Sequence, residues 1–223
     1  MSPPRFLPLP PRHDPLLPPE AAARRFFEAM QSRRSVRMFS DRPVSRETIA
    51  WIVRAAASAP SGANKQPWRF VAVQDKALKR AIRLGAEEEE RAFYGRRASR
   101  RWLEDLEPLG TDPEKPFLEV APWLLAVFQL GRDDAGGQVY YGVESVGIAA
   151  GFLLAAVHHA GLVALTHTPS PMKFLNAILK RPERERPFLL VPIGHPAEDC
   201  VVPEAALLRR PFEETLLFDA GGA

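Results

Sequence analysis

Apolar positions recur along this chain with two different periods, and each period predicts a different kind of element. Between residues 21 and 33, Phe26 and Met30 recur at helical spacing, which predicts an amphipathic helix. The runs 68–73 and 123–130 are short and mostly apolar, which is typical of buried strands. We therefore expect amphipathic helices packed on a central sheet.

Capping and turn residues delimit further elements. Ser45, with Thr48 in the first turn, is expected to cap a helix that ends near the turn at Pro60. The same criteria predict further helices over 76–106, 142–160 and 172–179, strands over 162–165 and 188–193, and a polar loop over 108–116. Helices and strands alternate within one compact unit, so the predicted class is α+β or α/β.

The N-terminal residues differ in composition from the rest of the chain. Residues 1–20 are rich in proline and lack the apolar run of a signal peptide, so we expect an extended arm there. Residues 21–223 fit one domain, which is large enough to bury a full core and a flat cofactor. Because 46% of the residues are apolar and 26% are charged, we expect a soluble protein, placed in the cytoplasm.

Charge and cysteine content exclude several classes of function. The net charge is +3 and the arginines are dispersed, so nucleic-acid binding is not expected despite a pI of about 9.2. No zinc-ligand spacing is present, and the single cysteine, Cys200, is expected to be an ordinary loop thiol. The apolar stretch 146–165 contains His158, His159 and three glycines, which favours a buried core helix over a membrane span.

The first candidate for ligand binding is the segment Arg33-Arg34-Ser35-Val36-Arg37. Three guanidinium groups and a hydroxyl lie within five residues, and arginine donors match phosphate oxygens two at a time. The segment is a plausible cradle for a phosphomonoester. The alternative is a solvated basic helix end, which the helix dipole favours.

Two further segments are candidates for contact with a flat ligand. In the loop 59–68, glycine allows close approach of the backbone, and free N–H groups can bond ring carbonyls. A simple helix-to-strand connection is the alternative there. In Thr166-His167-Thr168, two hydroxyls and an imidazole follow a predicted strand. The alternative for His167 is a satisfied polar residue without a role in binding.

Taken in this order, the three segments resemble the nitroreductase superfamily, over roughly residues 24–218. The resemblance implies an α+β fold in which a mixed sheet is flanked by helices, and a domain-swapped homodimer that binds FMN at its interface. It implies that the phosphate and ribityl chain contact Arg33, Arg34, Ser35, Val36, Arg37 and Arg209. The flavin ring would contact Ser61 and Gly62 of the other subunit and Thr166, His167 and Thr168.

A narrower resemblance lies between these motifs. The run from Glu87 to Leu106, followed by Lys115, is similar to the active-site lid of the iodotyrosine deiodinases. In that family a Glu, a Tyr and a Lys bind the amino-acid end of the substrate, and the matching positions are Glu90, Tyr94 and Lys115. A zwitterion needs an anion for its ammonium and donors for its carboxylate, and this set supplies both. The alternative is a solvated charged helix.

The same resemblance implies two catalytic contacts. Thr168 would lie near flavin N5, where a threonine is associated with one-electron chemistry in the deiodinases, and the N–H of Ala63 would meet the substrate phenolate. His167 stands where animal members have a threonine. The membrane anchor of those members has no counterpart here, so no membrane association is expected.

The sequence therefore supports one main hypothesis and three alternatives. The main hypothesis is an FMN-dependent reductase that removes halide from halotyrosines and receives electrons from NAD(P)H or from a reductase partner. One alternative is a generic NAD(P)H nitro- or quinone reductase, and another is the flavin-cleaving branch of the superfamily. The last is a non-catalytic FMN-binding protein.

Overall fold

The computed structural model describes residues 4–133 and 135–218, and the chain divides into two compact units, Met1–Arg33 and Arg34–Ala223. The first unit contains an extended, exposed segment and helix α1 (Pro19–Met30), none of whose residues is buried. Phe26 and Phe27 are 62% and 61% exposed, so the helix predicted over 21–33 has its apolar side uncovered within its own unit. The predicted arm boundary at residue 20 stays a prediction.

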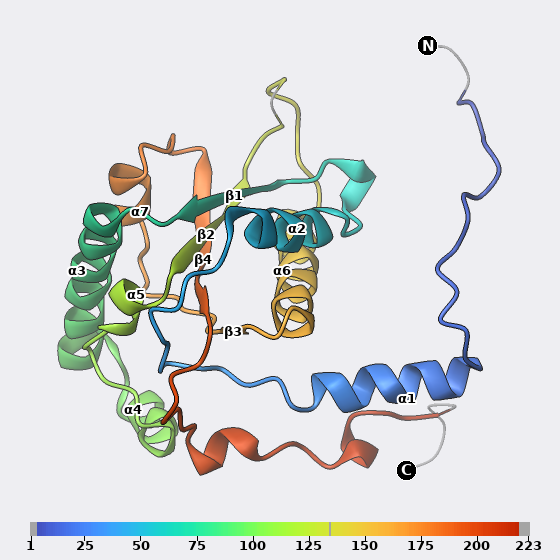
Figure 1. The fold of residues 1–223 in the computed structure, drawn as a ribbon. Helices are drawn as coiled ribbons and strands as arrows, with labels where there is room; N and C mark the ends of the chain where they lie inside the picture. Colours follow the sequence, from blue (N-terminus) through green and yellow to red (C-terminus); the bar gives the residue numbers. More distant parts are fainter. Residues whose placement is uncertain (1–3, 134, 219–223) are drawn as a thin grey trace. The chain divides into compact units, whose positions relative to one another are not determined.

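The second unit is built on a four-stranded sheet in the order β1-β2-β4-β3 (Figure 1). The strands are β1 (Trp68–Val73), β2 (Trp123–Leu130), β3 (Val163–Ala164) and β4 (Glu185–Gly194). All three strand pairings are antiparallel. Within the described residues, parallel pairing is found only at the isolated bridge between Ser35 and Ala164, so the mixed character expected of the sheet is confined to that point.

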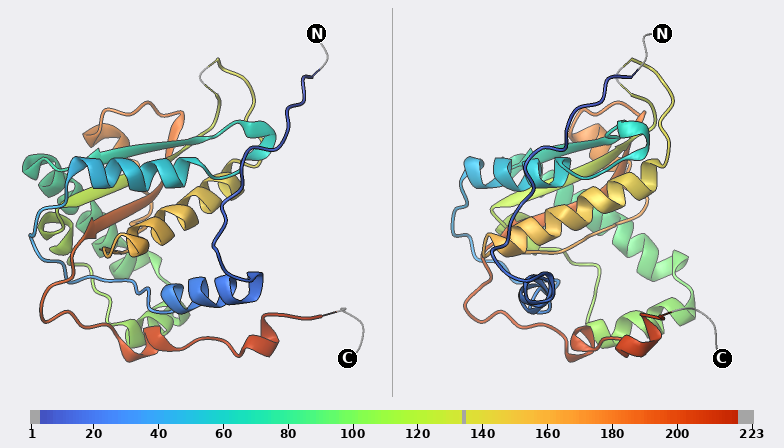
Figure 2. Two further views of the ribbon diagram at one scale, coloured as in Figure 1. Left: turned by 45° about the vertical axis from the view of Figure 1, so that its right-hand side comes forward. Right: turned by 90° about the vertical axis from the view of Figure 1, so that its right-hand side faces the viewer.

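Helices cover both faces of this sheet (Figures 1 and 2). The helices of the second unit are α2 (Arg46–Ala57), α3 (Lys76–Ala92), α4 (Arg100–Leu106), α5 (Phe117–Val120), α6 (Gly142–His159) and α7 (Phe174–Ile178). Ser45 caps α2 as predicted, because its Oγ accepts a hydrogen bond of 3.0 Å from the Thr48 N–H. The α+β class is therefore confirmed.

The side chains of β2 alternate between two hydrophobic cores, since successive residues of a strand point to opposite faces. Leu125 and Val127 join the core under α2 and α6. Leu124, Ala126 and Phe128 join the core under α3, α5 and α7. Burial on both faces explains why this strand is continuously apolar in sequence.

The long charged helix predicted over 76–106 is divided in the structure. Helix α3 ends at Ala92, a π-helical turn spans Phe93–Arg97, and α4 starts at Arg100. Ser99 begins the new helix by accepting a hydrogen bond of 3.2 Å from the Trp102 N–H. The prediction of one continuous helix was wrong because charged residues continue at helical spacing through the turn. Single π-turns occur frequently at functional sites.

One described helix, α6, is long and apolar enough to cross a membrane by length and composition alone. It packs against α2, β1, β2 and β3, and Val146, Ala149 and Leu153 are fully buried against them. These contacts favour the predicted core helix. Core helices of soluble proteins meet the same length criterion, so the match is weak evidence for a membrane span.

Candidate active site

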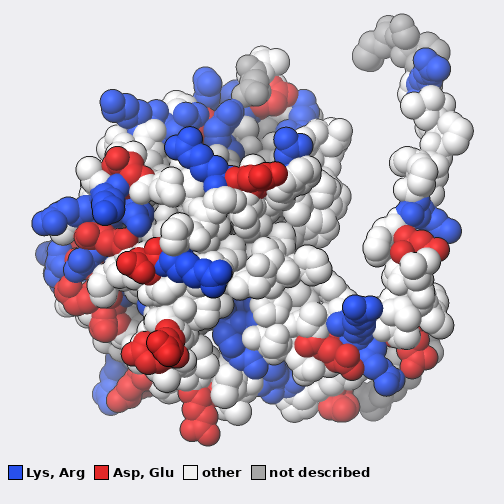
Figure 3. Space-filling model, in the orientation of Figure 1, with Lys and Arg blue, Asp and Glu red and all other residues white. Residues whose placement is uncertain are grey.

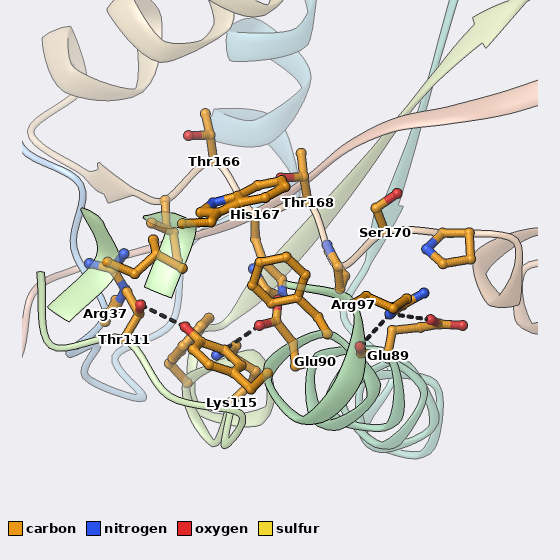
Figure 4. Close-up of a pocket in the computed structure, with 18 residues that line it drawn as sticks. Arg37, Glu89, Glu90, Arg97, Thr111, Lys115, Thr166, His167, Thr168 and Ser170 are labelled. Atoms are coloured by element: carbon orange, nitrogen blue, oxygen red, sulfur yellow. Dashed lines mark hydrogen bonds and ion pairs between the residues drawn. The ribbon is translucent and has the colours of Figure 1, made fainter. Parts of the chain in front are cut away.

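A cavity of about 530 Å³ opens beside the end of β3, between the segment that follows it and the α3–α4 region. Figure 4 shows the side chains that converge on it. The predicted site residues that line it are Arg37, Glu90, Tyr94, Lys115, Thr166, His167 and Thr168. Four segments distant in sequence therefore meet here, which a solvated charged helix would not require.

The basic segment reaches the cavity by pairing with β3. The Val36 N–H donates a hydrogen bond of 3.1 Å to the Ala164 carbonyl, next to the bridge between Ser35 and Ala164. Val36 is itself buried in the core, whereas Arg37 lines the cavity. Partial burial lowers the pKa of Arg37, and the nearby Tyr94, Asp112 and Glu90 oppose that shift. Arg37 therefore supplies the cavity with a positive charge.

The residues after β3 alternate in direction. Thr166 and Thr168 are exposed, and the intervening His167 is only 7% exposed. The His167 backbone is held by two hydrogen bonds of 2.9 Å with Leu190, one in each direction. In Figure 4 the two threonines lie above the imidazole, which is directed down toward Glu90. The two hydroxyls therefore share one face, and the imidazole belongs to the other.

Glu90 and Lys115 form an ion pair at the base of the cavity. Lys115 Nζ lies 3.6 Å from Glu90 Oε2, and the side chains are 8% and 13% exposed. Burial raises the pKa of the Glu90 carboxyl and lowers the pKa of the Lys115 ammonium, although each partner opposes the shift of the other. Both shifts favour the neutral forms, so the cost of removing the two charges from water exceeds the attraction between them.

Tyr94 completes the predicted group of three. Its hydroxyl hydrogen-bonds the Thr111 Oγ1 at 2.7 Å, and Lys115 Nζ lies 6.0 Å from the centre of its ring. Burial raises the pKa of Tyr94, with Thr111 opposing the shift. A neutral phenol is a hydrogen-bond donor, so one acid and two donors meet in this cavity.

Aromatic residues that the sequence reasoning did not assign form one wall. Phe93 packs edge-on against Tyr94 at 5.3 Å and against Trp102 at 4.9 Å between ring centres. Trp102 nevertheless remains 55% exposed. A lone tryptophan inside a charged segment was the available sequence signal, because an exposed Trp in a charged helix has no core to join.

Lys115 is held in place through its backbone as well as its charge. The Lys115 N–H donates a hydrogen bond of 2.7 Å to Glu87 Oε1, and Arg83 Nε binds the same carboxylate oxygen at 2.6 Å. Glu87 is only 3% exposed. The hydrogen bonds to its carboxylate lower the pKa of Glu87 although burial opposes this. This anchor fixes the start of α5 against α3.

Several predicted cofactor contacts lie outside this cavity. Arg34 and Ser35 precede the lining residue Arg37 but do not line the cavity themselves. Arg33 is the last residue of the first unit. Arg209 donates hydrogen bonds to the carbonyls of Ala206 and Leu208 in an exposed segment. These contacts stay predictions.

The loop that contains Ser61, Gly62 and Ala63 also lies elsewhere. Figures 1 and 2 show it beyond the end of α2, on the side of the sheet away from α3. Ala63 has a left-handed backbone with φ of 49°, and a Cβ on Gly62 would meet the Tyr140 carbonyl at 2.8 Å. Among the described residues the exposed Ala63 N–H has no hydrogen-bond partner, whereas the Gly62 N–H binds Ser145 Oγ. The Ala63 N–H is therefore available to donate a hydrogen bond to a ligand.

Among the described residues, no group of three His, Cys, Asp or Glu side chains lies close enough together to hold a metal ion. Cys200 is partly buried, and burial raises the pKa of its thiol. A thiol with a raised pKa is a poor nucleophile, which agrees with the interpretation of an ordinary loop residue.

Sequence comparisons identify relatives that share most of this chain. The family model described as "Nitroreductase family" matches residues 30–195. An iodotyrosine deiodinase from Haliscomenobacter hydrossis is 57% identical over 183 residues, which are 80% of this chain and 82% of that protein. Human iodotyrosine deiodinase 1 is 41% identical over 199 residues, which are 86% of this chain and 68% of that protein.

Solved structures give the same result for the fold. A crystal structure of oxidized iodotyrosine deiodinase bound to FMN and 3-iodo-L-tyrosine matches with a TM-score of 0.74 and 30% identity, covering 89% of this chain and 100% of that chain. A putative NADH dehydrogenase/NAD(P)H nitroreductase from Parabacteroides distasonis shares the fold at 20% identity, with a TM-score of 0.63. The chain therefore belongs to the nitroreductase family and, within it, to the iodotyrosine deiodinases.

Proposed function

We propose that this protein is an FMN-dependent enzyme that removes iodide reductively from iodotyrosine. The observation that carries the proposal is the meeting of Glu90, Tyr94 and Lys115 with Thr168 in one cavity. The relative that is 57% identical and the structural neighbour with bound FMN and 3-iodo-L-tyrosine are both iodotyrosine deiodinases.

The charged residues of the cavity suit an amino-acid zwitterion. Glu90 can accept from an ammonium group, and Lys115 and Tyr94 can donate to a carboxylate. In the structure Glu90 and Lys115 pair with each other at 3.6 Å, so a zwitterion would replace one buried pair by two. A nitroarene or quinone has no such charges, so binding it would leave this pair unchanged. The arrangement therefore favours an amino-acid substrate over the generic reductase alternative.

The residues present also fit FMN. Thr166 and Thr168 put two exposed hydroxyls on one face of an extended segment, and Arg37 lies in the same cavity for an anionic or carbonyl group. When bound, FMN supplies the electron pair that reductive loss of iodide requires. Thr168 would hydrogen-bond the ring, and Arg34, Ser35 and Arg209 would complete the phosphate contacts.

A second copy of the chain would supply the remaining ring contacts. The Ser61–Ala63 loop, with its free Ala63 N–H, lies away from the cavity of its own chain. Helix α6 exposes apolar residues: Val143 is 57% exposed, and Ile148 and Phe152 are 43% exposed each. Figure 3 shows an uncharged surface over this helix. We therefore infer a homodimer in which this loop of one subunit meets the cavity of the other.

The C-terminal segment is a candidate for the exchanged arm of this dimer. Leu208, Phe212, Leu217 and Phe218 are all at least 66% exposed, which is unusual for large apolar side chains in a monomeric protein.

The electron donor is proposed to be NAD(P)H or a reductase partner, and the location is proposed to be the cytoplasm.

The proposal is tested by stopped-flow oxidation of the reduced, FMN-loaded protein. We expect 3-iodotyrosine to oxidise the flavin at least tenfold faster than 2-iodophenol, on the scale of one hydrogen bond to a charged group. Glu90→Gln should remove this preference and keep FMN bound. Glu88→Gln, which changes an exposed neighbour on α3, is the matched control and should preserve the preference. Equal rates for the two compounds in the wild type would contradict zwitterion recognition.

A further inference from the structure

His167 has a buried ring nitrogen that the structure leaves without a partner. Its Nε2 makes no hydrogen bond with any of the described residues, and the side chain is 8% exposed. The ring packs edge-on against Phe117 at 6.0 Å between centres. A buried nitrogen without a hydrogen bond lowers the stability of a protein by about 1–3 kcal/mol. We therefore expect this imidazole nitrogen to bind a partner in another state of the site.

Glu90 is the acceptor to which this nitrogen is directed. His167 Nε2 lies 3.9 Å from Glu90 Oε1, while Lys115 Nζ lies 3.6 Å from Glu90 Oε2. The carboxylate thus stands between an ammonium and an imidazole, one beside each oxygen. A shift of about 1 Å would bring the imidazole nitrogen within hydrogen-bond distance of the carboxylate.

We propose that His167 is a positioning residue that donates its Nε2–H to Glu90 when Lys115 leaves Glu90 for the carboxylate of the substrate. This inference rests on the proposed function, because the exchange needs a zwitterion. Without a second donor, Glu90 would turn toward the substrate ammonium with one oxygen buried and unsatisfied. With it, one oxygen binds His167 and the other faces the ammonium.

The electrostatics of the cavity keep this imidazole neutral. Burial lowers the pKa of His167 to about 3, and the positive charges of Lys115 and Arg37 act in the same direction. A neutral imidazole carries one proton, so it can donate from Nε2 without adding a charge that would compete with the ammonium for Glu90. The neighbouring charged groups that face Glu90 are Lys115, Arg97 and Asp112.

Side chains alternate in direction along the segment that follows β3, and this supports a contact of the His167 side chain with Glu90. Thr166 and Thr168 point to the opposite side, and both backbone groups of His167 are used by Leu190. His167 therefore contacts Glu90 and Phe117 with its side chain and the sheet with its backbone. The predicted contact of His167 with the flavin ring stays a prediction, and the proposal adds a role in substrate recognition.

The first test is the binding of 3-iodotyrosine to oxidised, FMN-loaded protein, followed by flavin fluorescence. His167→Phe keeps a ring against Phe117 and removes the donor, so the dissociation constant should rise about tenfold. His167→Gln keeps a donor near the position of Nε2 and should restore binding to within about threefold of wild type. His195→Gln, a histidine outside the cavity, is the control for loss of an imidazole.

The second test reads the tautomer directly. In protein with 15N-labelled histidines, the His167 signal, assigned by its loss in His167→Gln, should show a neutral ring protonated at Nε2 across pH 6–8. Adding 3-iodotyrosine should shift that nitrogen, and Glu90→Gln should abolish the shift. A ring protonated only at Nδ1, or equal binding by the His167→Phe and wild-type proteins, would overturn the inference. Failure of wild-type protein to bind 3-iodotyrosine at all would instead refute the proposed function.

Discussion

We predict that the buried pair of Glu90 and Lys115 lowers the free energy of unfolding of the protein. Burial shifts the pKa of each group against its charged form. Replacing such a pair by neutral residues is often neutral or stabilises a protein by about 1–4 kcal/mol. We expect Glu90→Gln combined with Lys115→Met to raise the free energy of unfolding by about 1–2 kcal/mol, or roughly 2–8 °C in Tm for a chain of this size.

The single variants should behave differently from the pair. Each leaves one buried charge without its partner, so Glu90→Gln or Lys115→Met alone should lower the free energy of unfolding by about 1–3 kcal/mol. The coupling between the two substitutions should therefore be about 3 kcal/mol or more in this cycle. Urea unfolding followed by circular dichroism measures it, at fixed protein and FMN concentrations because both shift the apparent stability.

The pH dependence gives the sign of the effect. The folded pKa of Glu90 is raised above the ordinary 4.5. The stability that this carboxyl contributes is therefore fully present below pH 4.5 and is lost as the pH rises through the folded pKa. The folded pKa of Lys115 is lowered below the ordinary 10.5. The stability that this amine contributes is therefore fully present above pH 10.5 and is lost as the pH falls through the folded pKa. The advantage of the double variant should be largest between the two folded pKa values. A double variant less stable than wild type at neutral pH would refute the reasoning.

Three further predictions concern neighbouring residues. Thr168→Ala should slow flavin oxidation by 3-iodotyrosine at least tenfold in stopped-flow, with FMN affinity within about threefold of wild type. Arg37→Leu should weaken FMN binding by about 10–100-fold in fluorescence titration, since it removes charge-assisted hydrogen bonds; unchanged affinity would place Arg37 outside the cofactor site. Glu87→Gln should lower kcat/KM for 3-iodotyrosine more than for 2-iodophenol, because the hydrogen bond that anchors the Lys115 backbone loses its charged acceptor and weakens; equal losses would make Glu87 purely structural.

Much of the fold could be predicted because its strands are buried on both faces. The strands at Trp68–Val73 and Trp123–Leu130 begin and end at the predicted residues. Strand β4 was predicted to start at residue 188 but starts at Glu185, which is 2% exposed and paired with Arg181 at 2.6 Å. A buried glutamate in a strand is recognisable only when its partner is known, so polarity alone placed the boundary too late.

The site was predicted in parts by different arguments. Glu90 and Tyr94 are four residues apart, so helical spacing alone could place them on one face. Resemblance to a family was needed to add Lys115, which comes from a separate segment. The direction of His167 was within reach of the sequence, since alternation along an extended segment separates it from Thr166 and Thr168. Its pairing with Glu90 was not, because that contact depends on how α3 packs beside the sheet.

The central claim, reductive loss of iodide from an amino-acid substrate, is tested most directly by product analysis in a single anaerobic turnover. Reduced, FMN-loaded protein is mixed with excess 3-iodotyrosine, and iodide, tyrosine and oxidised flavin are quantified together. Two electrons and a proton replace the carbon–iodine bond by carbon–hydrogen. We therefore predict one iodide and one tyrosine for each flavin oxidised. Flavin oxidation without iodide release, or reduced flavin that persists beside 3-iodotyrosine, would contradict the account.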